Sequence, residues 1–146
     1  MKIARRFKFE AAHQLPYHDG ACRRLHGHTY HLELELQGPV RPVRPEDPQS
    51  GFVVDFGLLD RLIKGDLLEP WLDHQYLNDH LPGILYPSAE RLAAWILVWC
   101  LDHAPLGELL GRAGVTRVRL WETPRSMAEA TPEEARQLFP RGLPLP

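Results

Sequence analysis

Five of the eight histidines in the chain lie close together, between His13 and His31. Two of them belong to the motif His26-Gly27-His28, and residues two apart on a β-strand point to the same face. A third imidazole from a neighbouring strand would complete a metal site, and His13 is the best candidate because it ends an alternating segment. Three neutral histidines suit zinc and leave a fourth coordination position open, as in catalytic sites. The spacing alone fits ordinary buried or surface histidines equally well.

Three further positions carry reactive side chains, each weak evidence by itself. Cys22 lies four residues before His26, and a nearby cation would favour its thiolate form. Asp73 directly precedes His74, and an adjacent carboxylate raises the basicity of an imidazole. Glu122 falls on the inward face of an expected strand, where an unpaired carboxylate is costly. It would pair either with the adjacent N–H donors of a pterin or guanine edge, or with an arginine at the strand end.

The remaining histidines and the second cysteine are interpreted as structural. His31 lies on the polar face of its strand, so we expect it to face solvent. His18, His80 and His103 fall in loops or at helix ends. Cys100 lies next to the apolar side of a predicted helix, which favours a buried, unreactive thiol.

Three segments alternate with a period of two and are predicted to be strands. In the second of them, one face carries His26, His28 and apolar residues, and the other carries polar ones. The third follows two glycines, Gly111 and Gly114. These strands cover about residues 3–14, 26–37 and 115–123.

Helices are predicted between and after the strands. One follows the apolar run 51–56 and continues, with leucines at helical spacing, to Pro70. Another begins after Ser88, a plausible N-cap, with Glu90 favoured in its first turn by the helix dipole. A last short helix is indicated by the capping box that starts at Thr131. Because the helices are grouped rather than alternating with strands, we expect an α+β fold with an antiparallel sheet.

The composition is that of an ordinary globular domain. The chain has 146 residues, 44% of them hydrophobic and 25% charged, with a net charge of −2. We expect a single domain over residues 1–146, with a proline-rich tail at about 140–146. The charge balance predicts no nucleic-acid partner, and the absence of a long apolar run predicts no membrane span. The N-terminus lacks an export signal, so we expect a cytoplasmic location and reduced thiols.

Six segments, in register, resemble the 6-pyruvoyl-tetrahydropterin synthase family. The chain is most similar to the bacterial branch of that family, the 6-carboxy-5,6,7,8-tetrahydropterin synthases of queuosine biosynthesis. In that branch the cysteine lies four residues before the His-Gly-His motif, as Cys22 does here. The segments are Phe9–His13, Cys22–His28, Val54–Phe56, Leu72–Asp79, Pro87–Glu90 and Glu122–Thr123.

The resemblance implies a fold, an assembly and a cofactor. The fold would be the tunnelling fold, a four-stranded antiparallel sheet with two helices packed on one face. Subunits would join their sheets into barrels, as a homohexamer of two trimers. Zn²⁺ would be held by the three histidines His13, His26 and His28.

The resemblance also implies roles for other residues. Cys22 would be the catalytic general base. Asp73 and His74 would form a relay that completes a site between subunits. Substrate binding would fall to Glu122, which anchors the pterin ring, and to Ser88 and Glu90.

The implied reaction converts 7,8-dihydroneopterin triphosphate to 6-carboxy-5,6,7,8-tetrahydropterin, acetaldehyde and triphosphate. Alternatives are a synthase that stops at 6-pyruvoyl-tetrahydropterin, a non-catalytic zinc-containing protein that binds a pterin or purine, and a structural zinc module. The sequence departs from the family pattern in two places. Residues 124–130 offer only a short, weak final strand, and the loop 39–48 is longer than usual.

Overall fold

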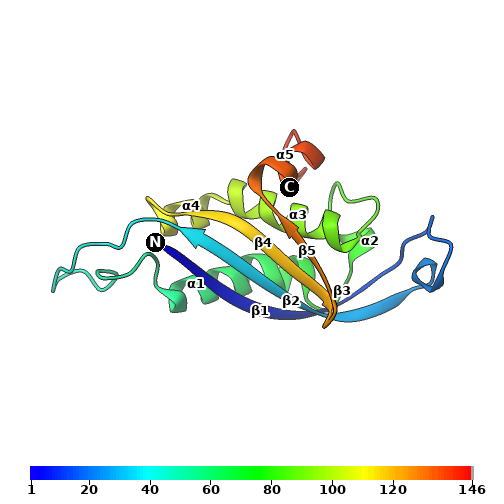
Figure 1. Cartoon of the computed structure of the whole chain (residues 1–146), viewed down its shortest axis with the longest axis horizontal. Coiled ribbons are helices and arrows are strands. Elements are labelled where there is room, and N and C mark those ends of the chain that lie inside the picture. The colour runs from blue at the N-terminus through cyan, green and yellow to red at the C-terminus, as the bar shows by residue number, and fades with distance from the viewer. Residues whose placement is uncertain (146) are drawn as a thin grey trace.

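One five-stranded sheet forms the centre of the computed structural model, which describes residues 1–145. The strand order is β3-β1-β2-β4-β5, and neighbouring strands are antiparallel except for β1 and β3, which are parallel. Helices cover one face of this sheet (Figure 1). The strands are β1 Lys2–His13, β2 His26–Gln37, β3 Gln75–Tyr76, β4 Gly114–Thr123 and β5 Ser126–Ala130.

The long hairpin of β1 and β2 follows from the alternation in both strands. Residues such as Phe9 and Leu34 are buried on the inner face, whereas Lys8 and His31 on the other face are exposed. The antiparallel register pairs His13 with His26. The alternation in the sequence therefore predicts both strands, and the register between them brings His13 and His26 together at the end of the hairpin.

Two long helical stretches pack their apolar sides on the inner face of the sheet. In the first, α1 runs directly into a π-helix, η2. The second, α3, begins after Ser88, whose hydroxyl accepts a hydrogen bond from Arg91 N. The helical elements are η1 Ala21–Arg23, α1 Phe56–Leu62, η2 Ile63–Leu72, α2 Leu77–His80, α3 Ala89–Asp102, α4 Ala104–Leu110 and α5 Pro132–Leu138.

The predicted helix does not stop at Pro70 but continues to Leu72. A proline lacks the N–H that donates a helical hydrogen bond, and its ring clashes with the carbonyl four residues earlier in a regular α-helix. The wide turns of η2 continue beyond it, and Asp73 N donates to Leu68 O, five residues earlier, over 2.7 Å. This ending directs the chain back to the edge of β1.

The sheet has five strands, so the expectation of a four-stranded, wholly antiparallel sheet was wrong in its count. The additional strand, β3, is only two residues long and therefore leaves no alternation in the sequence. The doubtful segment after Pro124 does form a strand, because Ser126–Ala130 pairs with β4. The capping box at Thr131 also forms, at the start of α5.

The outer face of the sheet carries a network of ion pairs rather than helices. Glu33 is almost fully buried there, and its two carboxylate oxygens accept hydrogen bonds from Arg6 Nε at 2.7 Å and from Arg119 at 2.6 Å. Arg119 also contacts Glu35 and Glu129. These pairs tie β1, β2, β4 and β5 together on the outer face.

No single helix within residues 1–145 is long and apolar enough to cross a membrane. Only α3 and α4 taken together, bent by 70° at their junction, reach that length and composition. Most of α3 lies in the protein core.

Candidate metal centre and active site

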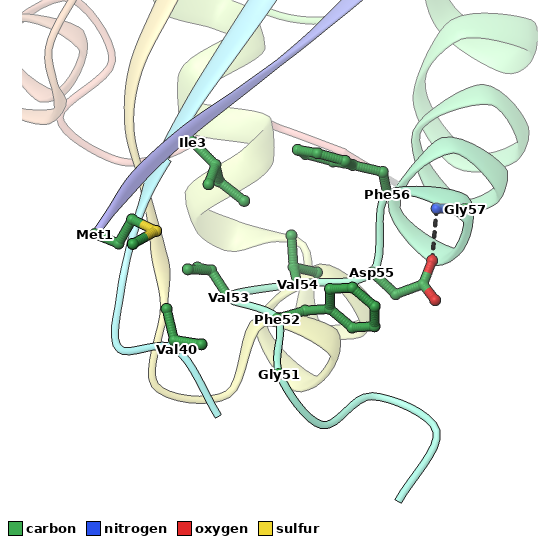
Figure 2. A pocket seen from close by; sticks show the side chains of 10 residues that line it. All are labelled: Met1, Ile3, Val40, Gly51, Phe52, Val53, Val54, Asp55, Phe56 and Gly57. Atoms are coloured by element: carbon green, nitrogen blue, oxygen red, sulfur yellow. Dashed lines mark hydrogen bonds between the residues drawn. The ribbon is translucent and has the colours of Figure 1, made fainter. Parts of the chain in front are cut away.

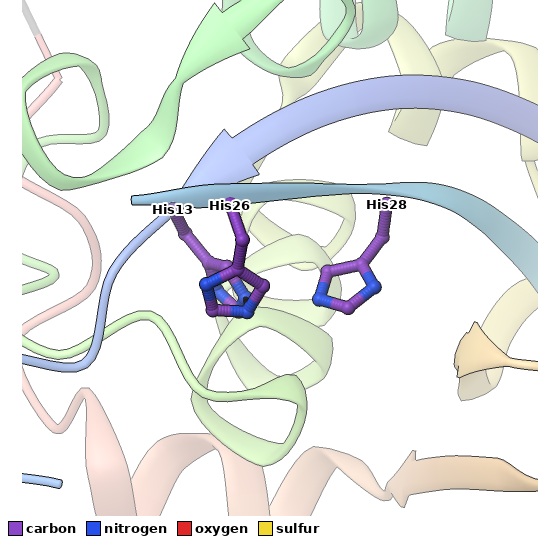
Figure 3. A group of neighbouring side chains, drawn as sticks. All are labelled: His13, His26 and His28. Atoms are coloured by element: carbon purple, nitrogen blue, oxygen red, sulfur yellow. Dashed lines mark hydrogen bonds between the residues drawn. The ribbon is translucent and has the colours of Figure 1, made fainter. Parts of the chain in front are cut away.

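Three histidines converge on the inner face of the hairpin, where β1 ends and β2 begins (Figure 3). The Nε2 atoms of His13 and His26 lie 3.1 Å apart. One ring nitrogen from each of His13, His26 and His28 lies within 4.8 Å of the other two. Two nitrogens on one tetrahedral zinc would be about 3.3 Å apart, because each Zn–N bond is about 2.0–2.1 Å long. The spacing is therefore that of a three-histidine metal site.

Hydrogen bonds fix which nitrogen faces the site in two of the three rings. The Nδ1 atoms of His13 and His26 each lie 2.7 Å from a backbone carbonyl, of Pro87 and of Arg24 respectively. A carbonyl only accepts, so both Nδ1 atoms carry hydrogen, and in the neutral rings the Nε2 lone pairs point inward. His28 Nε2 is buried and has no hydrogen-bond partner within residues 1–145. Two inward lone pairs and a third, unpartnered ring nitrogen fit a divalent cation such as zinc.

Burial keeps two of these rings in the form that binds metal. Desolvation lowers the pKa of His13, and it outweighs the opposing effects of the Pro87 carbonyl and the Glu122 charge. Burial likewise lowers the pKa of His28. Both imidazoles are therefore neutral at pH 7, and metal binding does not have to displace a proton from them.

Glu122 completes the polar side of this cluster. It lies near the end of β4, and its Oε1 is 3.3 Å from His13 Nε2 and 3.6 Å from His28 Nε2. The register of β2 and β4 pairs His31 with Trp121, so Tyr30 lies opposite Glu122 on the inner face. The Glu122 side chain is 24% exposed, which leaves it open to a ligand as well as to the histidines.

Cys22 lies in the short helix η1 and lines the same cavity as Glu122. Its backbone carbonyl accepts a hydrogen bond from Leu15 N at 2.8 Å, which holds this turn against the end of β1. The thiol is partly buried and lines a cavity of about 270 Å³. The same cavity is lined by four predicted or neighbouring polar residues: His18, Ser88, Glu90 and Glu122.

The first turn of α3 joins this cavity to the metal site. Ser88 caps the helix, and the preceding residue, Pro87, supplies the carbonyl that orients His13. Glu90 follows in the first turn and is exposed at the cavity. The helix start therefore places two of the predicted substrate-binding residues, Ser88 and Glu90, within three residues of a contact to the metal site.

Asp73 and His74 form a pair at the edge of β1, where the chain leaves η2. Asp73 Oδ2 lies 3.0 Å from His74 Nδ1, and Asp73 Oδ1 accepts from Glu10 N at 2.9 Å. Burial alone would raise the pKa of Asp73, but the hydrogen bonds from Glu10 and His74 hold it below its ordinary value. His74 is 78% exposed and adopts a left-handed backbone with φ of 59°.

This pair faces a different hollow from the one beside Cys22. A depression of about 550 Å³ is lined by His74, by His28, and by outward-facing positions of the hairpin such as Glu10 and Thr29. His74 does not line the cavity that contains Cys22. Within one chain, the described residues therefore do not bring the relay pair to the thiol.

A third hollow, at the far end of the sheet, lacks the residues for chemistry. It has a volume of about 390 Å³ and is lined mainly by apolar side chains such as Ile3, Phe52 and Phe56 (Figure 2). Its only titratable side chain is Asp55, which caps α1 by accepting from Gly57 N at 2.6 Å. The candidate active site is therefore at the histidine end.

Comparison with known proteins shows the family to which the chain belongs. The model of the family described as 6-pyruvoyl tetrahydropterin synthase matches residues 2–133. The chain belongs to this family. A Synechocystis relative named 6-carboxy-5,6,7,8-tetrahydropterin synthase is 40% identical over 126 residues, which are 86% of this chain and 89% of the relative. A Haemophilus influenzae relative of the same name is 32% identical, over 88% of this chain and 96% of its own length.

Other members of the family carry other names. A Pyrococcus furiosus relative, 31% identical over 83% of this chain and 89% of its own length, is named dihydroneopterin monophosphate aldolase. The structure of Caenorhabditis elegans 6-pyruvoyl tetrahydropterin synthase matches with a TM-score of 0.67 at 23% identity, covering 90% of this chain and 94% of that one. This likeness confirms the expected fold.

Most of the residues gathered here are predictable from the sequence, but two are not. Tyr30 is one: it continues the inner-face pattern after His26 and His28, which was the available signal. His18 is the other: it was interpreted as an ordinary loop histidine, yet it lines the cavity beside Cys22. His31 is exposed and Cys100 is buried, as expected.

Proposed function

We propose that this chain is a zinc-dependent 6-carboxy-5,6,7,8-tetrahydropterin synthase that acts in 7-deazapurine, or queuosine, biosynthesis in the cytoplasm. It would convert 7,8-dihydroneopterin triphosphate to 6-carboxy-5,6,7,8-tetrahydropterin, acetaldehyde and triphosphate. The observation that carries this proposal is the convergence of three histidine nitrogens next to Glu122, which lines the same cavity as Cys22. The names of the Synechocystis and Haemophilus influenzae relatives support the choice of reaction.

Each residue of the site has a chemical role in this proposal. His13, His26 and His28 hold the metal, which when bound supplies a Lewis acid that polarises oxygen atoms of the substrate side chain. Cys22 removes a proton from that side chain at Sγ. Glu122 accepts two parallel hydrogen bonds from the amino-pyrimidinone edge of the pterin.

The remaining residues position the substrate and move protons. Ser88 and Glu90, at the start of α3, border the pterin side of the cavity. His74, oriented by Asp73, exchanges a second proton with the substrate. Because His74 does not line the cavity that contains Cys22, we propose that His74 reaches the site from a neighbouring subunit, in a homohexamer of two trimers.

Mass spectrometry of the products tests the proposal. Zinc-loaded protein is incubated with 7,8-dihydroneopterin triphosphate, and we expect 6-carboxytetrahydropterin together with acetaldehyde. Accumulation of a pyruvoyl product alone would instead identify a 6-pyruvoyl-tetrahydropterin synthase. Tight pterin binding without turnover would contradict the enzyme and favour a binding protein.

A second candidate is an aldolase that acts on dihydroneopterin monophosphate, which the name of the Pyrococcus furiosus relative favours. The same assay with the monophosphate separates the two. An aldolase cleaves the side chain of the monophosphate, whereas the proposed synthase is expected to turn over only the triphosphate.

A further inference from the structure

His18 is held in place by the loop that leads from β1 to Cys22. Two backbone hydrogen bonds shape this loop: Leu15 N donates to Cys22 O at 2.8 Å, and His18 N donates to Leu15 O at 2.9 Å. The His18 ring is fixed to the same loop, because its Nδ1 accepts a hydrogen bond from Gly20 N at 2.8 Å. A ring nitrogen that accepts carries no hydrogen, so in the neutral imidazole the hydrogen is on Nε2. The loop therefore presents a hydrogen-bond donor whose tautomer is set by the backbone.

The absence of a side chain at Gly20 lets the imidazole lie this close to the backbone. A Cβ atom at position 20 would be 3.0 Å from His18 Cε1 and 3.3 Å from His18 Nδ1, which is closer than ordinary van der Waals contact. The backbone of Gly20 is extended, so the glycine provides space here and not an unusual backbone conformation. A larger residue at this position would therefore push the imidazole away.

His18 brings its donor to the cavity that contains Cys22. Within residues 1–145, the acidic side chains that line this cavity are Glu90 and Glu122, and His18 supplies the only side-chain nitrogen among the lining residues. Carboxylates attract the N–H groups of a pterin edge and repel phosphate. The anionic part of a ligand is therefore kept from the two glutamates and directed to the part of the cavity that carries His18.

The exposure of the lining residues gives the direction in which the cavity opens. Glu122 and Cys22 are partly buried, whereas His18 is exposed. The volume of about 270 Å³ lies below the range of about 300–1,000 Å³ that is usual for ligand pockets. The cavity therefore suits a bicyclic ring with the first atoms of its side chain, and a longer phosphate chain would leave it past His18.

We propose that His18 is a specificity-determining residue, which donates its Nε2 hydrogen to a phosphate oxygen of the substrate at the mouth of the cavity. This inference rests on the proposed function and deepens it, because it assigns a residue to the phosphate end of the pterin substrate. A hydrogen bond from an imidazole to a phosphate oxygen is charge-assisted. It therefore adds to the affinity for a phosphorylated pterin and not to the affinity for the pterin ring.

Equilibrium binding of two ligands tests this role. The parent protein is the zinc-loaded full-length chain with Cys22→Ala, so that the substrate is bound without being consumed. It is titrated with 7,8-dihydroneopterin triphosphate and with unphosphorylated 7,8-dihydroneopterin, and the ratio of the two dissociation constants measures the preference for phosphate. We expect the further change His18→Ala to lower this preference about tenfold or more, and to leave the affinity for 7,8-dihydroneopterin unchanged.

Three further variants separate phosphate binding from support of the loop. In His18→Asn the side-chain oxygen can still accept from Gly20 N, as in an Asx turn, but no donor extends to the position of Nε2. The loss in His18→Asn should therefore equal that in His18→Ala. Gly20→Ala keeps the imidazole but displaces it, so it should lose part of the preference. Tyr17→Phe, at an exposed position of the same loop outside the cavity lining, should behave like the parent protein.

The outcomes distinguish this inference from the proposed function. If His18→Ala keeps the preference for the triphosphate, His18 does not bind phosphate, while the pterin site stands. If His18→Asn keeps the preference that His18→Ala loses, or if His18→Ala weakens both ligands equally, His18 only supports the loop and the inference is wrong. A parent protein that binds neither ligand would overturn the proposed function together with this inference.

Discussion

His13 and His26 face each other through the lone pairs of their Nε2 atoms, 3.1 Å apart, because each ring donates its Nδ1 hydrogen to a backbone carbonyl. Two lone pairs at this distance repel one another unless a cation lies between them. The hairpin that brings the two rings together is therefore stabilised by the metal that it would bind.

Zinc binding should depend on the three inward histidines and not on their exposed neighbour. We expect one zinc per chain after gel filtration, and less than about a tenth of that for His26→Ala or His28→Ala. His31→Ala is the matched control, because His31 is exposed on the other face of the same strand. A chelator should lower the melting temperature of the wild type but not that of His28→Ala. Equal zinc loss in His31→Ala would contradict the site.

The two cysteines should differ in both chemistry and stability. Cys22→Ala should lower kcat by about 10²–10⁴-fold, as expected for loss of a general base, while pterin still binds. Cys100 is buried in α3, and burial raises the pKa of its thiol to about 12. Cys100→Ala should therefore keep kcat and lose only about 1 kcal/mol of stability.

Alkylation of the native protein provides an independent check on this difference. Iodoacetamide should modify Cys22, which is partly exposed, and spare Cys100. Unchanged turnover in Cys22→Ala would rule out the thiol as the base.

Mixed oligomers should reveal a site that is shared between subunits. Cys22→Ala and His74→Ala are each expected to be inactive, but hetero-oligomers produced by co-expression contain some sites with both residues intact. In a random equal mixture the activity should return to about a quarter of the wild-type value. Activity can return in this way only if the thiol and the imidazole of one site come from different chains, as their locations in separate hollows indicate.

A second mixture controls for this complementation. Cys22→Ala combined with His26→Ala should stay inactive, because both residues belong to one side of the same hairpin. Recovery in this mixture, or none in the first, would show that the relay is not supplied by a neighbour.

The buried Glu33 should make stability fall in acid. Burial alone would raise its pKa, but the hydrogen bonds from Arg6 and Arg119 hold the pKa below its ordinary value. The charged Glu33 therefore stabilises the folded state at any pH above the pKa of about 4.3 that it has in the unfolded chain. This stabilisation is lost as the pH falls through the lower pKa that Glu33 has in the folded protein. Urea unfolding at pH 7, 5, 4 and 3 measures this loss.

The variant Glu33→Gln isolates the contribution of the buried charge. At pH 7 it should lower the free energy of unfolding by about 1–3 kcal/mol, and it should flatten the fall below pH 5. Glu46→Gln, in an exposed loop, should leave both unchanged. A Glu33→Gln protein with the wild-type pH profile would show that other carboxylates control the acid transition.

The sequence predicted the histidine cluster because its geometry is local and periodic. A period of two places His26 and His28 on one face, and a tight register along a single hairpin brings His13 beside them. Tyr30 obeys the same period but was missed, because a tyrosine among apolar residues looks like ordinary core. It lies opposite Glu122, which comes more than ninety residues later in the chain.

Features that depend on distant contacts could not be predicted in this way. The strand β3 exists because the segment after η2 bonds to the edge of β1, where His74 N donates to Glu10 O at 2.6 Å. A strand of two residues is too short to show an alternating pattern, so the sequence at Gln75 and Tyr76 gives no indication of β3. The separation of the relay pair from Cys22 is likewise a property of the folded sheet.

The left-handed backbone of His74, with φ of 59°, has a consequence for how this protein can change. A residue with a Cβ atom in that region costs of order 1 kcal/mol, and glycine adopts it without that penalty. Selection for thermal robustness alone would therefore favour glycine at position 74, while selection for proton transfer favours the imidazole. Activity and robustness are opposed at this one residue, so variants evolved only for heat tolerance are expected to lose the imidazole there early.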